Sequence, residues 1–476
     1  MILSCQNLSK TFVDRPILKQ ASFQLEEHEK AAIVGVNGAG KTTLLKMIIG
    51  QLPADEGLIT FAKDKTFGYL AQQSDLSSSH TIYEELLSVK QDLVSMEQQL
   101  RDLEESMKHC EGTQLEEIMD RYTRMTHDFE VKGGLLYKSE LTGVLKGLSF
   151  LDEDFDKQIS TLSGGQKTRV SLAKLLLQSP DLIILDEPTN HLDIASISWL
   201  ETYLRSYKGA VLIVSHDRYF LDRVVTKVIA IENGLVRSYA GNYSDYAAKA
   251  AMLRKAAVNA YLKQQEEIHH QQQVIDKLKS FNREKSIKRA ESREKMLDKM
   301  ELLEKPVEIR DDMHLKLTPQ IISGNDVLSI EDLSKHFGSL TLFEHVDIEI
   351  KRGEHVAIIG DNGTGKTTLL KIINELESMD SGQIRLGSKV EIGYYDQEHH
   401  VLHSEKTLFD EISDDYPTLT NTQIRNTLAA FLFTGDDVFK KISELSGGER
   451  GRVSLAKLML SNANFLILDE PTNHLD

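Results

Sequence analysis

The chain has 476 residues and a formal net charge of −17, with 56 Lys and Arg against 73 Asp and Glu. This length predicts two or more domains, and this charge means that nucleic acid would bind only through a local basic patch. Two cysteines, Cys5 and Cys110, exclude a disulfide framework, while the short apolar runs and the N-terminus without a signal-peptide pattern predict a cytoplasmic protein with no membrane partner.

The first motif in chain order is a glycine-rich loop with the pattern G-x-x-x-x-G-K-[ST]. It follows the apolar run Ala31–Val34 and precedes a helical run from Leu44, and this strand–loop–helix context is typical of a phosphate-binding loop. Glycines let backbone amides surround phosphate oxygens, and the helix directs its positive end at the anion. Lys41 would reach the β- and γ-phosphates, and Thr42 would offer a hydroxyl to Mg²⁺. The candidate nucleotide-binding residues are Gly35, Asn37, Gly38, Gly40, Lys41, Thr42 and Thr43.

An inserted helical segment is predicted at about residues 86–130. It has no Pro, and apolar residues recur at helical spacing on both sides of Gly112, which predicts a helical hairpin. Its charge is acidic, with 5 Lys and Arg against 11 Asp and Glu, so 5 − 11 = −6. We expect an arm that projects from the first domain; helices packed back onto the domain are the alternative.

A second anion site is predicted where Leu162 begins the segment Leu-Ser-Gly-Gly-Gln. The segment precedes a predicted helix, Lys167–Gln178, and the start of a helix attracts anions. The candidate residues are Ser163, Gly164, Gly165 and Gln166.

Catalytic candidates follow two apolar runs. Asp186 and Glu187 come after Ile183–Leu185; Asp186 would hold Mg²⁺, and Glu187 would polarise the attacking water. His216 ends the next apolar run and is interpreted as a contact of the γ-phosphate, with a structural histidine as the alternative. Gln72 would sense the metal and the water.

A connector at about residues 246–306 has helical composition and no Gly, which predicts two long helices. Phe281 and Asn282 are interpreted as the turn between them. The segment Lys277–Lys295 holds eight basic and three acidic residues, so 8 − 3 = +5 inside an acidic chain. This predicts binding to a phosphate backbone, with a solvated helix face as the alternative. The basic residues are Lys277, Lys279, Arg283, Lys285, Lys288, Arg289, Arg293 and Lys295.

The motifs recur in a second copy. Lys366 follows Lys41 by 325 residues and Asp469 follows Asp186 by 283, so 325 − 283 = 42 residues are extra in the first copy, where the arm lies. A strand-like run, His355–Ile359, precedes the second glycine-rich loop. The second set of candidates is Gly360, Asn362, Gly363, Gly365, Lys366, Thr367 and Thr368 for phosphate, Ser446, Gly447, Gly448 and Glu449 at the helix start, Thr367, Gln397 and Asp469 for the metal, and Glu470 for catalysis.

The second copy is incomplete in this sequence. The sequence ends at Asp476, inside the second Asp-Glu-Pro-Thr-Asn-His-Leu-Asp motif, and a counterpart of His216 would fall near residue 216 + 283 = 499. This leaves hydrolysis at the second site undecided. It also predicts apolar sheet surface exposed in the second copy.

The chain resembles the ABC-F family of tandem ATP-binding-cassette proteins in the identity and order of five motifs. These are the lysine loop, the glutamine loop, the Leu-Ser-Gly-Gly segment, the Asp-Glu-Pro-Thr-Asn-His-Leu-Asp segment and the Ser-His-Asp segment. The resemblance covers almost the whole chain. It implies an α/β fold with two tandem P-loop ATP-binding-cassette domains, an inserted helical arm and a two-helix linker. The implied limits are residues 1–245, 246–306 and 307–476.

The resemblance also implies two ATP molecules with Mg²⁺, held between the two cassettes of one chain, so that no obligate homo-oligomer is needed. Site one would use Lys41, Asp186, Glu187 and His216 with Ser446–Glu449. Site two would use Lys366, Asp469 and Glu470 with Ser163–Gln166. Phe12 and Phe337 resemble the family's adenine-stacking aromatics, and a place in the core is the alternative for both.

The function implied by the resemblance is ATP hydrolysis coupled to binding at the ribosomal E site. The linker would reach the P-site tRNA, and the arm would touch ribosomal protein and rRNA. A ribosome-protection protein that confers antibiotic resistance, a transporter ATPase subunit and a DNA-linked ATPase are the alternatives. The moderate length of the linker favours a translation factor over a resistance protein.

Overall fold

The computed structural model describes residues 1–12, 15–36, 38–71, 78–190, 192–280, 284–300, 303, 319, 321–338, 340–395, 402–433 and 435–471. Contacts divide the chain into two compact units, Met1–Tyr239 with His314–Asp476, and Ala240–Met313.

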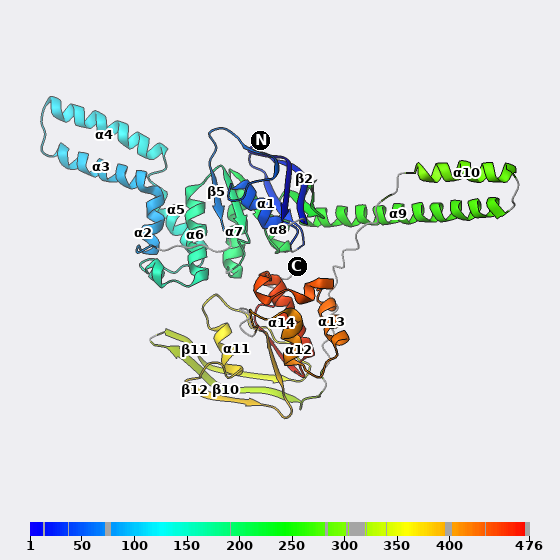
Figure 1. Ribbon diagram of the computed structural model, residues 1–476. Coiled ribbons are helices and arrows are strands. Elements are labelled where there is room, and N and C mark those ends of the chain that lie inside the picture. The colour runs from blue at the N-terminus through cyan, green and yellow to red at the C-terminus, as the bar shows by residue number, and fades with distance from the viewer. Residues whose placement is uncertain are drawn as a thin grey trace. The chain divides into compact units, whose positions relative to one another are not determined.

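The first copy of the repeat is built on a six-stranded sheet with the order β5-β6-β7-β3-β8-β9 (Figure 1). Its strands are β3 (Lys30–Val34), β5 (Phe67–Leu70), β6 (Leu182–Asp186), β7 (Ala210–Val214), β8 (Lys227–Glu232) and β9 (Leu235–Ala240). The strands from β5 to β8 pair in parallel, and β3, β6 and β7 are buried along their whole length, as parallel strands covered on both faces are. The residues that follow β3, β6 and β7 therefore meet at one edge of the sheet.

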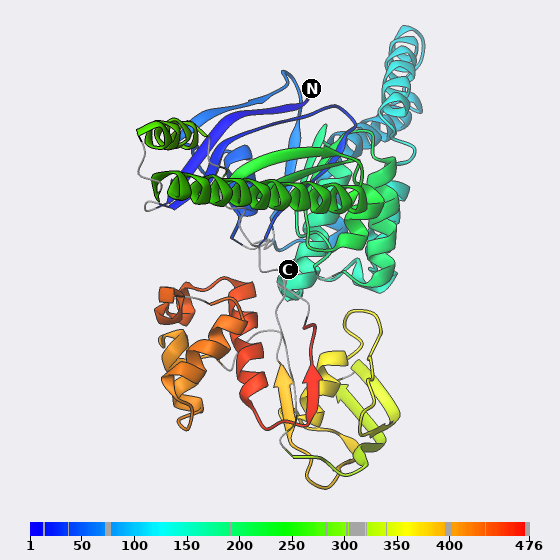
Figure 2. The same ribbon diagram turned by 90° about the vertical axis from the view of Figure 1, so that its right-hand side faces the viewer.

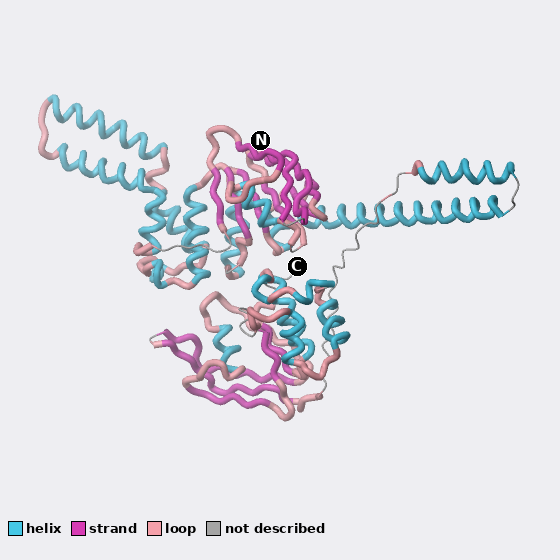
Figure 3. The backbone as a smooth tube through the Cα atoms, viewed as in Figure 1, coloured by secondary structure: helices cyan, strands magenta, loops and turns pink. Residues whose placement is uncertain are grey.

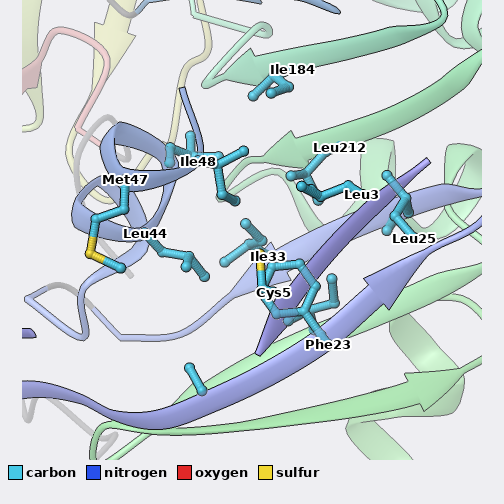
Figure 4. Packing of buried hydrophobic residues seen from close by; sticks show 14 of the residues in the cluster. Leu3, Cys5, Phe23, Leu25, Ile33, Leu44, Met47, Ile48, Ile184 and Leu212 are labelled. Carbon is cyan, nitrogen blue, oxygen red and sulfur yellow. The ribbon is translucent and has the colours of Figure 1, made fainter. Parts of the chain in front are cut away.

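A second, antiparallel sheet with the order β2-β1-β4 shares a core with the first sheet and α1. Its strands are β1 (Leu3–Phe12), β2 (Arg15–Leu25) and β4 (Glu56–Phe61), and α1 spans Lys41–Ile48. Leu44 and Ile48 of α1 lie in one hydrophobic cluster with Phe23 of β2, Ile184 of β6 and Leu212 of β7 (Figure 4). The helix that follows the glycine-rich loop is thus fixed by apolar packing to both sheets.

The remaining helices of the first copy are α2 (Ile82–Leu87), α5 (Tyr137–Gly147), α6 (Gly164–Gln178), α7 (Ile194–Ser206) and α8 (Arg218–Val224). Both α2 and α5 pack on α6. The expected inserted hairpin is formed by α3 (Gln91–Met107) and α4 (Thr113–Val131), which run side by side (Figure 1, Figure 2). Leu93, Leu100 and Phe129 form its apolar contact, and Tyr137 of α5 joins that cluster at the base.

The unit Ala240–Met313 contains the two long helices expected of the connector, α9 (Tyr243–Ser280) and α10 (Glu284–Asp298), which lie side by side (Figure 3). Ile275 and Ala290 are buried in this unit. The turn interpreted at Phe281 and Asn282 lies outside the described residues. Within the described ranges, no helix carries an apolar stretch long enough to cross a membrane.

The second copy has an antiparallel sheet with the order β11-β10-β12 and a parallel pair, β13 and β14. The strands are β10 (Asp326–Phe337), β11 (Leu340–Lys351), β12 (Ser381–Leu386), β13 (Ile392–Tyr395) and β14 (Phe465–Leu468). The helices are α11 (Lys366–Ile373), α12 (Leu408–Asp415), α13 (Asn421–Ala430) and α14 (Gly447–Leu460).

The prediction of a strand at His355–Ile359 is wrong, because these residues form no strand in the structure. In the first copy, β3 is hydrogen-bonded between β7 and β8, and the described part of the second copy holds no counterpart of either. A strand needs neighbours to pair its N–H and C=O groups. Val356 and Ile359 are accordingly 56% and 78% exposed, in line with the expected exposure of apolar surface.

Candidate active site

The glycine-rich loop turns between β3 and α1. Gly38 has φ 77° and Gly40 has φ 101°, left-handed values that favour glycine. A Cβ on Gly40 would also lie 2.5 Å from Ile17 Cγ2. Gly363 and Gly365 repeat the turn with φ 86° and 90°. Each turn ends directly at a helix, because α1 begins after Gly40 and α11 begins after Gly365. The backbone N–H groups at these helix starts have no intrahelical acceptor.

Lys41 is 8% exposed and lies over its own loop. Its Nζ donates to the carbonyl oxygens of Gly35 at 2.6 Å and Val36 at 3.4 Å. Lys366 repeats this arrangement with the carbonyl oxygens of Gly360 and Asp361, both at 2.7 Å. The ammonium thus lies beside the amino-terminal end of α1, where its charge and the positive end of the helix would attract the same anion.

Two carboxylates lie at the end of β6. Asp186 is 4% exposed, and the Glu187 side chain is 11% exposed. Burial raises the pKa of Asp186 to about 6 and that of Glu187 to about 7, while the charge of Lys41 opposes both rises. Glu187 has φ 52° and Glu470, after β14, has φ 47°, so both copies hold this residue in the left-handed region.

His216 lies beside Glu187, because β6 and β7 are parallel neighbours and both residues follow strand ends. The backbone N–H of His216 donates to Glu187 Oε2 at 3.2 Å, and His216 Nε2 lies 3.4 Å from Glu187 Oε1. The backbone N–H of Glu187 donates to the carbonyl oxygen of Val214 at 2.8 Å. An imidazole and a carboxylate are therefore held together at the edge of the sheet that carries Lys41.

The residues present suit a magnesium ion bound with nucleotide phosphates. The Thr42 hydroxyl in the first turn of α1 and the Asp186 carboxylate are hard oxygen donors, and Mg²⁺ takes few such protein ligands together with water and substrate phosphates. The buried carboxylates with raised pKa values are the observation that fits the ion. A divalent cation beside them would offset the cost of burying their negative charge.

Both Leu-Ser-Gly-Gly segments are helix starts closed by a capping box. The Ser163 Oγ accepts from Gln166 N at 3.3 Å, and Gln166 Oε1 accepts from Ser163 N at 3.0 Å. At α14, Glu449 Oε2 accepts from both Ser446 N at 2.8 Å and Ser446 Oγ at 2.7 Å. Because of this cap, α6 begins at Gly164, three residues before the predicted start. The paired glycines, Gly164–Gly165 and Gly447–Gly448, form the first helical positions.

Phe12 and Phe337 lie at the ends of β1 and β10, 45% and 49% exposed. The alternative that they belong to the core is therefore wrong. The ammonium of Lys10 lies 5.7 Å from the centre of the Phe12 ring, and that of Lys335 lies 4.9 Å from the centre of the Phe337 ring. Each ring thus has an exposed surface for stacking.

Several predicted site residues cannot be placed. Asn37, Gln72, Gln397 and Arg283 lie outside the described residues, as do the side chains of Lys285 and Arg289. The other basic linker residues are exposed: Lys277, Lys279, Lys288, Arg293 and Lys295. Lys279 pairs with Glu294 at 2.5 Å, which neutralises part of the basic charge.

Lys46 was not among the predicted site residues, although its positive charge opposes the rise in the pKa of Asp186 that burial causes. The sequence offered one indication of it, because a lysine recurs at the equivalent position of the second copy, Lys371, 325 residues later.

Comparisons with known proteins give the family. A family model described as "ABC transporter" matches residues 18–190 and 343–473, and a second with the same description matches 229–317. The chain is 49% identical over 479 residues to YdiF of Bacillus subtilis (strain 168), covering 100% of this chain and 74% of that protein. It is 34% identical to ABC transporter F family member 5 of Arabidopsis thaliana, covering 99% and 69%. The chain belongs to the ABC-F family.

A third relative is the Energy-dependent translational throttle protein EttA of Mycobacterium tuberculosis (strain ATCC 25618 / H37Rv). The identity is 32% over 483 residues, covering 100% of this chain and 84% of that protein. This ABC-F chain is an ATPase, and the fold class expected from its motifs, two tandem P-loop cassettes with an inserted arm and a two-helix linker, is confirmed.

The raised carboxyl pKa values predict a pH-dependent stability. In nucleotide-free and magnesium-free protein, the free energy of unfolding should fall as pH rises from 4.5, the ordinary pKa of glutamate, through about 7, the pKa of folded Glu187. In this window the folded carboxyl keeps a proton that the unfolded chain has lost, so stability decreases with rising pH. Asp186 contributes with the same sign between 3.8 and about 6.

Urea unfolding across this window checks the expectation. The Glu187→Gln variant cannot ionise at this position and should show a flatter dependence on pH. Parallel curves for the parent and the variant would contradict a raised pKa at Glu187.

Proposed function

We propose that this ABC-F ATPase acts on the ribosome and uses ATP binding and hydrolysis to control how long it remains bound at the ribosomal E site. EttA, which is similar to the whole chain, is named as a translational throttle, and translation takes place on the ribosome. The observation that carries the proposal is the charge inversion in the linker, +5 over Lys277–Lys295 in a chain of −17. Such a patch is what a phosphate backbone binds. The protein would therefore work in the cytoplasm.

Nucleotide would bind at two composite sites, each made by the lysine loop of one cassette and the Leu-Ser-Gly-Gly helix start of the other. Mg²⁺, when bound, would offset the charge of the phosphates. Thr42 and Asp186 would hold it in site one and Thr367 and Asp469 in site two, with Gln72 and Gln397 beside the metal and the water. Phe12 and Phe337 would stack on the adenines.

The chemistry proposed for site one is argued from the contacts of Lys41, Glu187 and His216 in the structure. Lys41 would place its charge at the β- and γ-phosphates, where its present carbonyl partners are weaker acceptors than phosphate. Glu187 would accept a proton from the attacking water, since it is held at the strand end by the His216 backbone. His216 would then lie within reach of the γ-phosphate. Burial suits Glu187 to this role because it raises its pKa toward neutrality.

The linker and the arm would make the ribosomal contacts. Lys277, Lys288 and Lys295 are exposed on α9 and α10 and would meet the P-site tRNA. The arm has a net charge of −6 and would touch basic ribosomal protein beside rRNA.

A ribosome pelleting assay tests the proposal. The protein carrying Glu187→Gln and Glu470→Gln should co-sediment with ribosomes in ATP and stay in the supernatant in ADP, because it binds nucleotide and cannot hydrolyse it. Changing Lys277 and Lys295 to Glu should weaken this binding and flatten its salt dependence. Lys63→Glu, an exposed lysine in the turn after β4 and outside both the arm and the linker, is the matched control and should change neither.

Failure to pellet under conditions where ATP binding is measured directly would overturn the ribosome proposal. DNA binding would then be the next assay. Pelleting that is equal in ATP and ADP would overturn the nucleotide control.

A further inference from the structure

A buried glutamate joins the segment after the glutamine loop to the Leu-Ser-Gly-Gly helix of the first cassette. Glu85 of α2 has a side chain that is 8% exposed. Its carboxylate accepts a hydrogen bond from the Nζ of Lys174 in α6. On its other side, Glu85 Oε2 lies 3.3 Å from Nδ1 of His80, eight residues after Gln72 in the sequence. One carboxylate thus binds both the helix and the segment that follows the glutamine loop.

The second cassette repeats this contact with tighter burial. Glu411 of α12 has a fully buried side chain, and its Oε1 accepts from the Nζ of Lys457 in α14 at 2.6 Å. Nδ1 of His403 lies 3.1 Å from Glu411 Oε2. Lys457 follows Ser446 by 11 residues, as Lys174 follows Ser163. The two cassettes therefore place the glutamate and the lysine at equivalent points, and in each a histidine contacts the glutamate, five residues before Glu85 and eight before Glu411.

A backbone contact closes the same connection in both cassettes. Thr81 forms an antiparallel bridge with Gln158, and Ile159 N donates to the carbonyl oxygen of His80 at 3.1 Å. In the second cassette, Thr407 bridges Lys441. These partners stand shortly before Ser163 and Ser446, so each Leu-Ser-Gly-Gly helix is held both at its entrance and about three turns along.

Stability alone is a weak reason for such a contact. Replacing a buried ion pair with apolar residues of similar volume is often neutral or stabilising, because charges lose hydration on burial. A hydrogen-bonded charge pair instead fixes the direction and distance between two elements. Of the joined elements, one begins with the Leu-Ser-Gly-Gly segment that the proposed mechanism places at the nucleotide, and the other follows the glutamine loop in the sequence.

We infer that Glu85 and Glu411 are positioning residues for hydrolysis, each fastening the segment after its glutamine loop to its Leu-Ser-Gly-Gly helix so that the two move as one body. The inference rests on the proposed function of these two elements. Each Leu-Ser-Gly-Gly helix start would contact the nucleotide held by the other cassette. Glu411 thereby acts on site one, through Ser446–Glu449, and Glu85 acts on site two.

Steady-state hydrolysis and ATP affinity of the full chain test the inference. Glu411→Gln should lower kcat about tenfold and change the Kd for ATP less than about twofold, because one charge-assisted hydrogen bond is lost at a distance from the lysine loop. Glu85→Gln tests the first cassette. The exchange Glu85→Lys with Lys174→Glu restores an ion pair of opposite direction and should recover part of the lost kcat.

Two controls separate the inference from simpler accounts. Glu29→Gln removes the ion pair with Lys227, 3.2 Å apart at the amino ends of β3 and β8, and should leave kcat unchanged. Ser446→Arg blocks the helix start itself. If Ser446→Arg leaves kcat unchanged, the proposed composite site fails.

If Ser446→Arg lowers kcat while Glu411→Gln and Glu85→Gln do not, the composite site stands and the positioning role is overturned. A kcat that falls equally in Glu29→Gln, in proportion to the loss of thermal stability, would also overturn it. A kcat loss confined to the Glu85 and Glu411 variants, with ATP affinity kept and partial recovery in the exchange, supports it.

Discussion

Replacing Glu187 with glutamine is expected to lower ATP turnover at site one by about 100- to 1,000-fold while ATP still binds. The side chain is 11% exposed, and its Oε2 accepts the backbone N–H of His216 at 3.2 Å, a hydrogen bond that the glutamine oxygen can also accept. The variant keeps the shape and loses the group that would take a proton from water. Single-turnover hydrolysis, measured beside the Kd for ATP, checks both parts.

The control for Glu187→Gln is Glu201→Gln. Glu201 is another buried carboxylate of the first cassette, with its Oε2 3.0 Å from Arg223 Nη1. Its loss should reduce stability and leave turnover within about twofold. If Glu187→Gln kept most of the parent's turnover, the proton acceptor would have to lie elsewhere.

Lys41→Met should weaken ATP binding at site one by roughly 100-fold, since the ammonium makes charge-assisted contacts with the phosphates. In the structure this ammonium donates to the carbonyl oxygens of Gly35 and Val36, so methionine also removes contacts that hold the loop. A fluorescent ATP analogue titrated against the variant measures the loss.

Lys30→Met is the matched control, because Lys30 stands at the other end of β3 and also donates to two backbone carbonyls, those of Tyr207 at 2.7 Å and Gly209 at 2.6 Å. It should lower stability and leave the Kd for ATP unchanged. Equal loss of affinity in both variants would mean that Lys41 acts through folding and not through phosphate contact.

Much of the site could be predicted from the sequence, because its motifs are local. A glycine-rich turn between a buried strand and a helix needs glycine at the left-handed positions Gly38 and Gly40, and the pattern of nine residues carries that requirement. The arm and the linker could be predicted for a similar reason, since helical periodicity is read within one segment. The repeat gave the glycine-rich loop, the Leu-Ser-Gly-Gly segment and the Asp-Glu pair a second instance in the same chain.

Contacts between distant segments could not be predicted in this way. The pairing of β6 with β7 brings Glu187 and His216 together across 29 residues, and burial raises the pKa of that glutamate to about 7. The Glu85–Lys174 contact spans 89 residues and lies in no motif.

The sequence by itself determined the order of the motifs, their duplication and the basic linker, because each depends on residues close together in the chain. The tertiary structure decided which of these residues meet and which strands form. The apolar run His355–Ile359 resembles β3 in sequence but forms no strand. In contrast, β3 pairs with β7 on one side and β8 on the other. A strand is completed by hydrogen bonds to its neighbours, and those neighbours come from other parts of the chain.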